Sequence, residues 1–132
     1  MLSGFHTYFF RALAFAALLL FASCANEESG PYNQVLAQPD FASITDSIRK
    51  MPDNDSLYFR RAVLLNQKNF PEVALADFKQ AWTISPREVY AYAIGNLLLL
   101  KEPQESISFI TAAAKKIEPS GRMLLTLAQA YL

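Results

Sequence analysis

The sequence predicts an all-α protein made of stacked antiparallel helix pairs, about six helices in all, preceded by a secretion signal and a flexible tether. Two observations support this prediction. Pro52, Pro86 and Pro119 lie 34 and 33 residues apart, and each closes a helix-compatible stretch at the same point of an internal repeat. Near the N-terminus, an unbroken apolar run ends at the only cysteine of the chain, Cys24. A period in the low thirties is typical of arrays of paired helices.

Small residues recur with the same period as the prolines. Three positions return after a uniform shift of 33 residues, because Ala62, Ala81 and Pro86 become Gly95, Ala114 and Pro119. Paired helices approach closely only where side chains are short, because the ridges of one pack into the grooves of the other. We therefore expect Ala62 to face Ala74 and Ala81, and Gly95 to face Ala114. Any one alanine could simply be a good helix former, but the repeated set favours close packing.

Local signals predict where several helices begin. Ser85, Pro86 and Glu88 have the spacing of a capping box, with Ser85 as the cap and Pro86 at the first helical position. Asp55 and Pro71 mark two more predicted starts.

These residues resemble the tetratricopeptide repeat, strongly in one copy. In that copy the aromatic, small and closing positions of the family are filled by Tyr58, Ala62, Ala74, Phe78, Ala81 and Pro86. In the next copy Ile107 and Thr111 replace an expected alanine and an expected aromatic, so that copy is degenerate. The resemblance predicts an array over residues 40–132 that consists of a partial leading repeat 40–53, repeat 54–86, degenerate repeat 87–119 and incomplete repeat 120–132.

The two outer segments of the array each supply one helix of a pair. The leading segment has the apolar spacing of a second helix in Phe41, Ile44, Ile48 and Met51. The last segment has the spacing of a first helix in Leu124, Leu127, Ala128 and Tyr131. Because its apolar stripe has no partner helix in the sequence, we expect either a fragment of a longer array, or burial of residues 123–132 by self-association or against a partner.

The N-terminal segment predicts a membrane anchor. Arg11 precedes the apolar run 12–22, which is shorter than the ~20 residues that a spanning helix needs and fits the core of a signal peptide. Residues 21–24, Phe-Ala-Ser-Cys, resemble the lipobox of bacterial lipoproteins, although Phe21 stands where Leu is usual. The resemblance implies a signal peptide over residues 1–23 and a lipidated Cys24. A free buried thiol, or an ordinary signal peptide with a fortuitous cysteine, is the alternative.

Residues 24–39 are mostly polar and predict a flexible tether, which would span about 5–6 Å times the square root of its length. Asn26-Glu27-Glu28 resembles the acidic signal that sends some Bacteroidetes lipoproteins to the cell surface, and a plain solvated linker is the alternative. The expected location is therefore the bacterial cell envelope, as an outer-membrane lipoprotein on its periplasmic or surface side.

Charge and composition exclude several function classes. Without residues 1–23 the chain has 11 basic and 12 acidic residues, which gives no electrostatic case for nucleic acid. The only histidine, His6, lies in the signal peptide, so we expect no catalytic residue, no metal site and no enzymatic activity. The covalent lipid on Cys24 is the only expected prosthetic group. The pair Arg60 and Arg61 reads as a solvated helix face.

The family resemblance implies a partner-binding groove on the concave face, lined by the first helix of each repeat. Carried over to this chain, the groove positions are Phe59, Val63, Asn66, Tyr92, Asn96, Leu99, Leu125 and Gln129. This set is apolar and aromatic with amides, so the expected partner is a protein or peptide with an apolar or amphipathic segment. Packing of Phe59 and Tyr92 between repeats is the alternative.

Two functions remain open at this point. The favoured function is a lipid-anchored scaffold that binds protein partners, in envelope assembly or secretion. The alternative is a lipid-anchored binding protein for nutrient or glycan capture.

Overall fold

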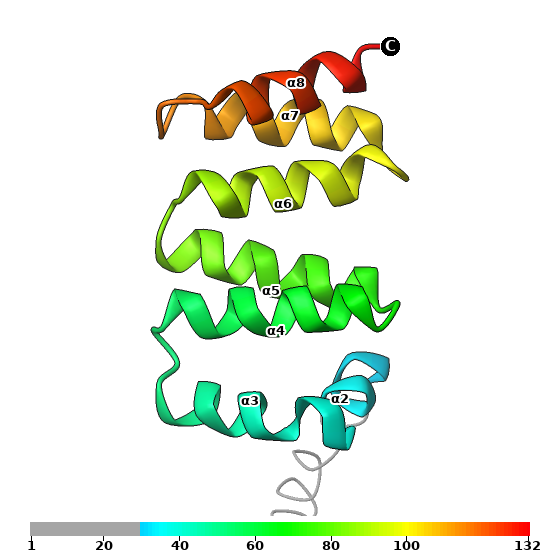
Figure 1. The fold of residues 1–132 in the computed structure, drawn as a ribbon, viewed down its shortest axis with the longest axis vertical. Helices are drawn as coiled ribbons and strands as arrows, with labels where there is room; N and C mark the ends of the chain where they lie inside the picture. The colour runs from blue at the N-terminus through cyan, green and yellow to red at the C-terminus, as the bar shows by residue number, and fades with distance from the viewer. Residues whose placement is uncertain (1–29) are drawn as a thin grey trace, which may run out of the picture. The chain divides into compact units, whose positions relative to one another are not determined.

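The computed structural model describes residues 30–132, which contain seven α-helices and no β-strand (Figure 1). The helices are α2 (Pro31–Leu36), α3 (Pro39–Lys50), α4 (Asp55–Gln67), α5 (Pro71–Ile84), α6 (Glu88–Leu99), α7 (Pro103–Ala113) and α8 (Gly121–Ala130). The all-α prediction is therefore confirmed for this part of the chain. The predicted signal peptide and Cys24 lie outside the described residues.

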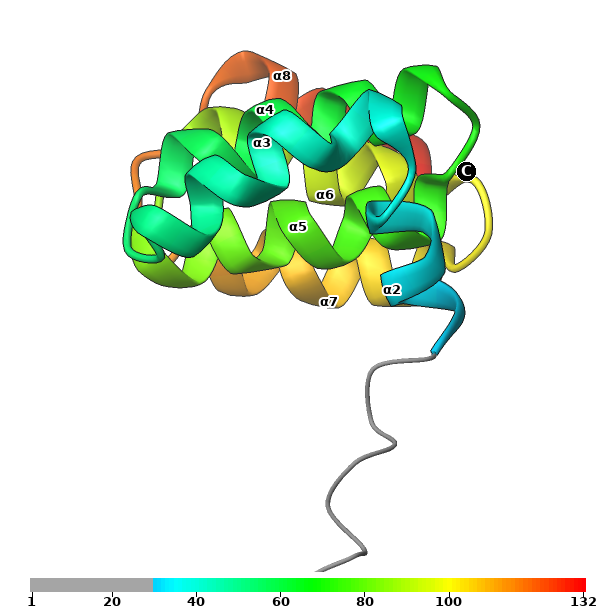
Figure 2. The same ribbon diagram turned by 90° about the horizontal axis from the view of Figure 1, so that it is seen from below.

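Helices α3 to α8 belong to one compact unit, residues 35–132. Within that unit successive helices run in opposite directions (Figure 1). Helix α4 packs against α5, α6 packs against α7, and α8 packs against both α6 and α7. Figure 2 shows α4 and α8 on one side of the unit and α5 and α7 on the other.

Three alternate helices of the unit, α3, α5 and α7, begin with a proline. Pro39, Pro71 and Pro103 are the first residues of α3, α5 and α7, at intervals of 32 residues. Proline suits this position because the first N–H groups of a helix have no intrahelical acceptor. The predicted start at Pro71 is confirmed. The regular spacing of these three prolines, which the sequence analysis overlooked, is a second repeat signal beside the closing prolines.

Of the remaining predicted helix starts, one is confirmed and one needs correction. Helix α4 begins at Asp55, as predicted, and is capped by Asn54, whose side chain accepts a hydrogen bond from the Ser56 amide at 3.2 Å. The capping box at Ser85 does not form. Ser85 remains the C-terminal cap of α5, where its amide donates to the carbonyl of Ala81, and α6 begins only at Glu88 without a side-chain cap.

The small residues of the first full helix pair are buried, as close packing of that pair requires. Ala62 on α4 and Ala74 and Ala81 on α5 are completely buried, and the two helices pack against each other. In the next pair Gly95 leaves no room for a side chain, because an added Cβ would overlap the side chain of Ile110 on α7.

Ala114, the predicted packing partner of Gly95, is one residue away from the buried position of α7. Ala114 caps the end of α7 and is only half-buried, whereas Ala113 is 2% exposed. Equivalent residues of α5 and α7, the second helices of the two pairs, are 32 residues apart in sequence. The buried residues Ala74, Phe78 and Ala81 of α5 therefore correspond to Ser106, Ile110 and Ala113 of α7, which are also buried. Ile107 and Thr111 therefore do not stand at core positions, and the core pattern of this copy is better kept than the sequence indicated.

Part of the predicted tether, residues 24–39, is helical in the structure. Residues 31–36 form α2, and its last residue, Leu36, is buried. Leu36 belongs to the hydrophobic core and Val35 packs against it, so burial of these two apolar side chains orders a segment that its polar neighbours suggested was free.

Candidate binding surface

The eight predicted groove residues lie at equivalent positions of α4, α6 and α8. Phe59, Val63, Tyr92 and Leu99 are half-buried, and Asn66, Asn96, Leu125 and Gln129 are exposed. None is fully buried, although every one of these helices contains buried residues at other positions. These eight residues together are named here the first-helix face.

Phe59 has a packing role on this face. Its ring lies 5.5 Å from that of Phe78 on α5 and 5.0 Å from that of Tyr90 on α6. It therefore joins one helix pair to the next, as the alternative interpretation of its sequence position expected. Tyr92 is also packed against the core but stays half-exposed.

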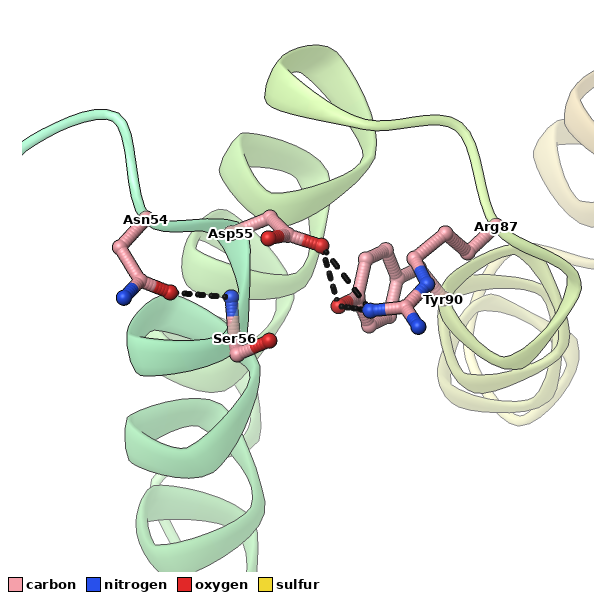
Figure 3. Close-up of polar contacts among 5 residues, drawn as sticks. All are labelled: Asn54, Asp55, Ser56, Arg87 and Tyr90. Carbon is pink, nitrogen blue, oxygen red and sulfur yellow. Dashed lines mark hydrogen bonds and ion pairs between the residues drawn. The ribbon is translucent and has the colours of Figure 1, made fainter.

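A cluster of polar side chains links the start of α4 to the start of α6 (Figure 3). The carboxylate of Asp55, at the start of α4, accepts hydrogen bonds from the Tyr90 hydroxyl at 2.6 Å and from Arg87 at 3.3 Å. Arg87 also donates to the Tyr90 hydroxyl oxygen at 3.1 Å. The Tyr90 hydrogen bond, helped by Arg87, holds the pKa of Asp55 below its usual value. The Tyr90 hydroxyl, helped by Asp55, raises the pKa of Arg87.

The same contact recurs one step along the array. Glu88 is the first residue of α6, 33 residues after Asp55, and its carboxylate accepts a hydrogen bond from the Ser120 hydroxyl at 2.5 Å. Ser120 stands 33 residues after Arg87 and caps α8. An acidic residue at the start of each first helix thus contacts the residues that begin the next first helix.

Ion pairs recur at the opposite ends of these helices. Lys68, after α4, pairs with Asp40 of α3 at 2.6 Å, and Lys101, after α6, pairs with Glu72 of α5. Both pairs join a first helix to the second helix of the preceding pair. They are about half exposed or more, so each contributes little to stability, but together they follow the repeat.

Arg61 is not on a solvated face, contrary to expectation. It is 4% exposed and forms two hydrogen bonds with Asp77, which is 1% exposed, at 2.6 and 2.8 Å. Its remaining terminal nitrogen donates to Thr45 of α3 at 3.1 Å. Its position four residues after Leu57 and four before Leu65, both buried, is the sequence signal that could have revealed its burial.

Two concavities of the described part lie between neighbouring helices. One groove of about 290 Å³ runs between α3 and α4 and is lined by Asp40, Ser43, Ile44, Ser47, Leu57, Arg60 and Leu64. A smaller one of about 120 Å³ lies between α5 and the end of α6, with Leu75, Leu97 and Leu100 among its lining residues. None of the eight predicted groove residues lines either one.

A third depression of about 540 Å³ is lined by the consecutive residues 50–55 alone. Within residues 30–132 no group of three His, Cys, Asp or Glu side chains could hold a metal ion. In the same range no helix has the length and apolar character needed to cross a membrane.

Glu102 and Glu105, on either side of Pro103, are neighbouring carboxylates at the start of α7. Their shared hydrogen bond raises the pKa of Glu102 and lowers that of Glu105. Glu105 also accepts a hydrogen bond from Lys79 of α5 at 2.9 Å. Both carboxylates are exposed, so the pair belongs to the surface that joins α5 to α7.

Comparison with known proteins finds no matching family model, no similar curated protein and no similar solved structure.

Proposed function

We propose that the chain is a lipid-anchored scaffold of the tetratricopeptide type, in the bacterial cell envelope, that binds protein or peptide partners along the first-helix face. Its helix pairs form a solenoid, and its partners are expected to present an apolar or amphipathic segment. Acylation of Cys24 supplies the membrane attachment. More than one acyl chain makes that attachment durable, because a single chain binds only marginally.

The observation that carries the proposal is the pattern of exposure on α4, α6 and α8. The position of Phe59 returns as Tyr92 and Leu125, and exposure rises from half-buried rings to a Leu125 side chain that is 60% exposed. The position of Val63 returns as Asn96 and Gln129, which are exposed amides. Apolar contact beside amide hydrogen-bonding groups, repeated along an extended face, suits a peptide segment better than a compact ligand.

Capture of a small molecule or glycan is the weaker proposal. Ligand pockets usually measure about 300–1,000 Å³ and have convergent polar groups. The two concavities between helices measure about 290 and 120 Å³. The larger depression, at residues 50–55, involves one loop only. None of the three favours this alternative.

Partner capture by crosslinking tests the groove. The detergent-solubilised chain carrying Tyr92→Ala and Leu125→Ala should recover much less crosslinked partner than the unchanged chain, because two apolar contacts on the face are removed. Leu100→Ala is the matched control, since Leu100 is an exposed leucine, 81% exposed, that lies outside this face. Equal loss of capture in both variants contradicts a role for the face.

Metabolic labelling with a fatty acid tests the anchor separately. We expect label on the protein and its complete loss in Cys24→Ser, with the unlabelled variant released from the membrane fraction. A chain that stays in that fraction without acylation contradicts the lipoprotein proposal and leaves the groove proposal standing.

A further inference from the structure

The larger of the two concavities between helices combines apolar side chains with one positive charge. Its walls are one stripe of α3, within residues 40–47, and one stripe of α4, within residues 57–64. We name it the α3–α4 groove. Among the described residues that line it, Arg60 is the only cation. The apolar side chains that line it are Ile44, Leu57 and Leu64. It shares no residue with the first-helix face, so it is a separate candidate site.

The side chain of Arg60 has no partner among the residues that the structure describes. It is exposed, and none of the ion pairs within residues 30–132 involves it. The only acidic residue that lines the groove, Asp40, already pairs with Lys68 at 2.6 Å. The groove therefore keeps one uncompensated positive charge beside apolar side chains. That combination is complementary to a carboxylate that stands next to an apolar group, and an arginine binds carboxylates with good geometry.

The equivalent place between α5 and α6 is narrower. The concavity there measures only about 120 Å³, against about 290 Å³ for the α3–α4 groove. It has larger side chains at three equivalent positions, and the smaller and larger members of each pair are Ser43 and Leu75, Ser47 and Lys79, and Leu57 and Tyr90.

The place between α5 and α6 also lacks a free charge. Lys79 pairs with Glu105 at 2.9 Å, and the residue of α6 equivalent to Arg60 is Ala93. An open groove with a free arginine is therefore a local feature of α3 and α4 and not a property of every repeat.

The dimensions of the α3–α4 groove suit a short extended segment of polypeptide. Each wall runs from one residue to another seven positions later, which is about 10 Å at ~1.5 Å per residue. An extended chain covers that length with about three residues. An α-helix, which is about 10–12 Å wide with its side chains, is too wide to enter a concavity of about 290 Å³. The Ser47 hydroxyl donates to the Ser43 carbonyl at 3.0 Å, which leaves its oxygen as an acceptor for a backbone N–H of the segment.

We propose that the α3–α4 groove binds a short extended segment of a partner protein in which a glutamate stands two residues from a leucine. The glutamate carboxylate pairs with Arg60, and the leucine packs against Ile44, Leu57 and Leu64. The spacing follows from the extended conformation, because alternate side chains of an extended chain point to the same side.

A second copy of the chain is a poorer occupant. The required spacing occurs in the chain itself at Leu100 and Glu102, in the turn after α6, where Leu100 is 81% exposed. This turn is not extended, because Leu100 has a helical backbone conformation and the Glu102 amide donates to the carbonyl of Leu98. Its leucine and glutamate therefore cannot enter the groove together without opening the end of α6.

Photocrosslinking with a synthetic peptide tests the proposal on the full chain in detergent. The probe is a short peptide with the central residues Leu-Ser-Glu, flanked by glycine and serine and carrying a benzophenone at one end. Mass spectrometry should locate the crosslinks within residues 40–47 and 57–64. The control peptide with glutamine in place of glutamate should label about fivefold less, because it forms no ion pair with Arg60.

Three protein variants sharpen the test. Arg60→Glu should remove the preference for the glutamate peptide and favour the same peptide with lysine at that position. Arg49→Glu is the matched control, because it makes the same change of charge on α3 at a residue that does not line the groove. Ser43→Leu copies the equivalent residue of α5 and should strongly reduce labelling. Ser43 is exposed, so circular dichroism should show unchanged helical content.

Opposite outcomes overturn the proposal. Equal labelling by the glutamate and glutamine peptides would mean that Arg60 recognises nothing in the segment. A dimer in sedimentation equilibrium that Leu100→Ala abolishes would assign the groove to a second copy. Stronger labelling after Glu27→Gln with Glu28→Gln would assign it to the chain's own acidic residues.

The α3–α4 groove and the first-helix face are tested independently. Tyr92→Ala with Leu125→Ala, which tests the first-helix face, should leave peptide labelling of the α3–α4 groove unchanged. Loss of labelling in that variant would contradict a separate site.

Discussion

Arg61 marks a clear difference between the helix pair α4–α5 and the pair α6–α7. Its buried pair with Asp77 lies where the following pair has Ile94 and Phe109, both apolar. The fold at this position is therefore compatible with either a paired charge or apolar packing. Replacement of a buried ion pair by apolar residues is often neutral or stabilising, whereas removal of one partner alone is strongly destabilising.

This contrast predicts the behaviour of single and double variants. Asp77→Ala should lower the free energy of unfolding by about 3–5 kcal/mol, because it leaves the Arg61 charge buried without its main partner. The double variant Arg61→Ile with Asp77→Phe, which copies the next pair, should recover most of that loss. Urea unfolding measures both. Asp46→Ala, in the exposed pair with Arg49, is the control and should barely move the midpoint.

The Asp55 cluster gives a prediction for acid stability. The lowered pKa of Asp55 means that its contribution to stability is complete above the ordinary pKa of about 3.9 and is lost as the pH falls through the pKa of the folded state. Tyr90→Phe removes the hydroxyl that is the largest cause of the shift. The pKa of Asp55 should then rise toward its usual value, as followed by its carboxyl carbon signal in NMR titration. An unchanged titration would mean that Arg87 holds the carboxylate alone.

At the scale of the helices, the sequence predicted well which helices form and which of them pair. It predicted less well how the residues of one helix pair align with those of the next. Closing prolines and the small residues Ala62, Ala74 and Ala81 predicted the first full pair, because these positions follow from close helix contact. The second pair was misaligned by one residue. Helix α6 has 12 residues and α4 has 13, so the chain reaches Pro103 one residue sooner than a shift of 33 allows.

Caps and burial of polar residues could not be predicted for a different reason. Asn54 and Asp55 are both good N-cap residues, and only the backbone conformation selects Asn54. The paired charges of Arg61 and Asp77 are 16 residues apart, so no local pattern joins them. For Phe59 the sequence left two interpretations open, partner contact and packing between repeats, because an aromatic ring at this position suits both. Only the structure shows that the ring packs between Phe78 and Tyr90.

The corrected alignment of α7 predicts losses of stability of different size for two neighbouring alanines. Ala113→Leu should overpack the contact of α7 with α6 and lower the free energy of unfolding by about 1–3 kcal/mol. Ala114→Leu, at the half-buried end of α7, should cost clearly less. Thermal or urea unfolding of the two variants decides between the registers. A larger loss for Ala114→Leu would restore the uniform shift of 33 residues.

At the scale of the unit formed by residues 35–132, stability should vary along the array. Helix α8 buries only Met123 and Thr126, while α4 buries four residues and α6 five. Local opening is easiest where few apolar contacts are lost. We therefore expect the amides of α8 to exchange with deuterium faster than those of α4, α5 and α6, measured by mass spectrometry of peptic fragments. Equally slow exchange in α8 would contradict this gradient of stability.

The order of contacts along this unit has a consequence for how the protein is made. The main interhelical contacts join helices that are adjacent or next but one in sequence, so no helix waits for a distant segment before it can pack. Such local topologies fold quickly, and a chain that emerges N-terminus first from a ribosome or a translocation channel can settle helix by helix. On α3 the exposed residues Ala42, Asp46 and Arg49 stand 32 residues before the buried Ala74, Phe78 and Ala81 of α5, so the first helices to assemble present a largely polar side. At each step only the most recently formed helix then has an uncovered apolar face, and a chaperone that protects the unfinished chain would need to shield one helix face at a time.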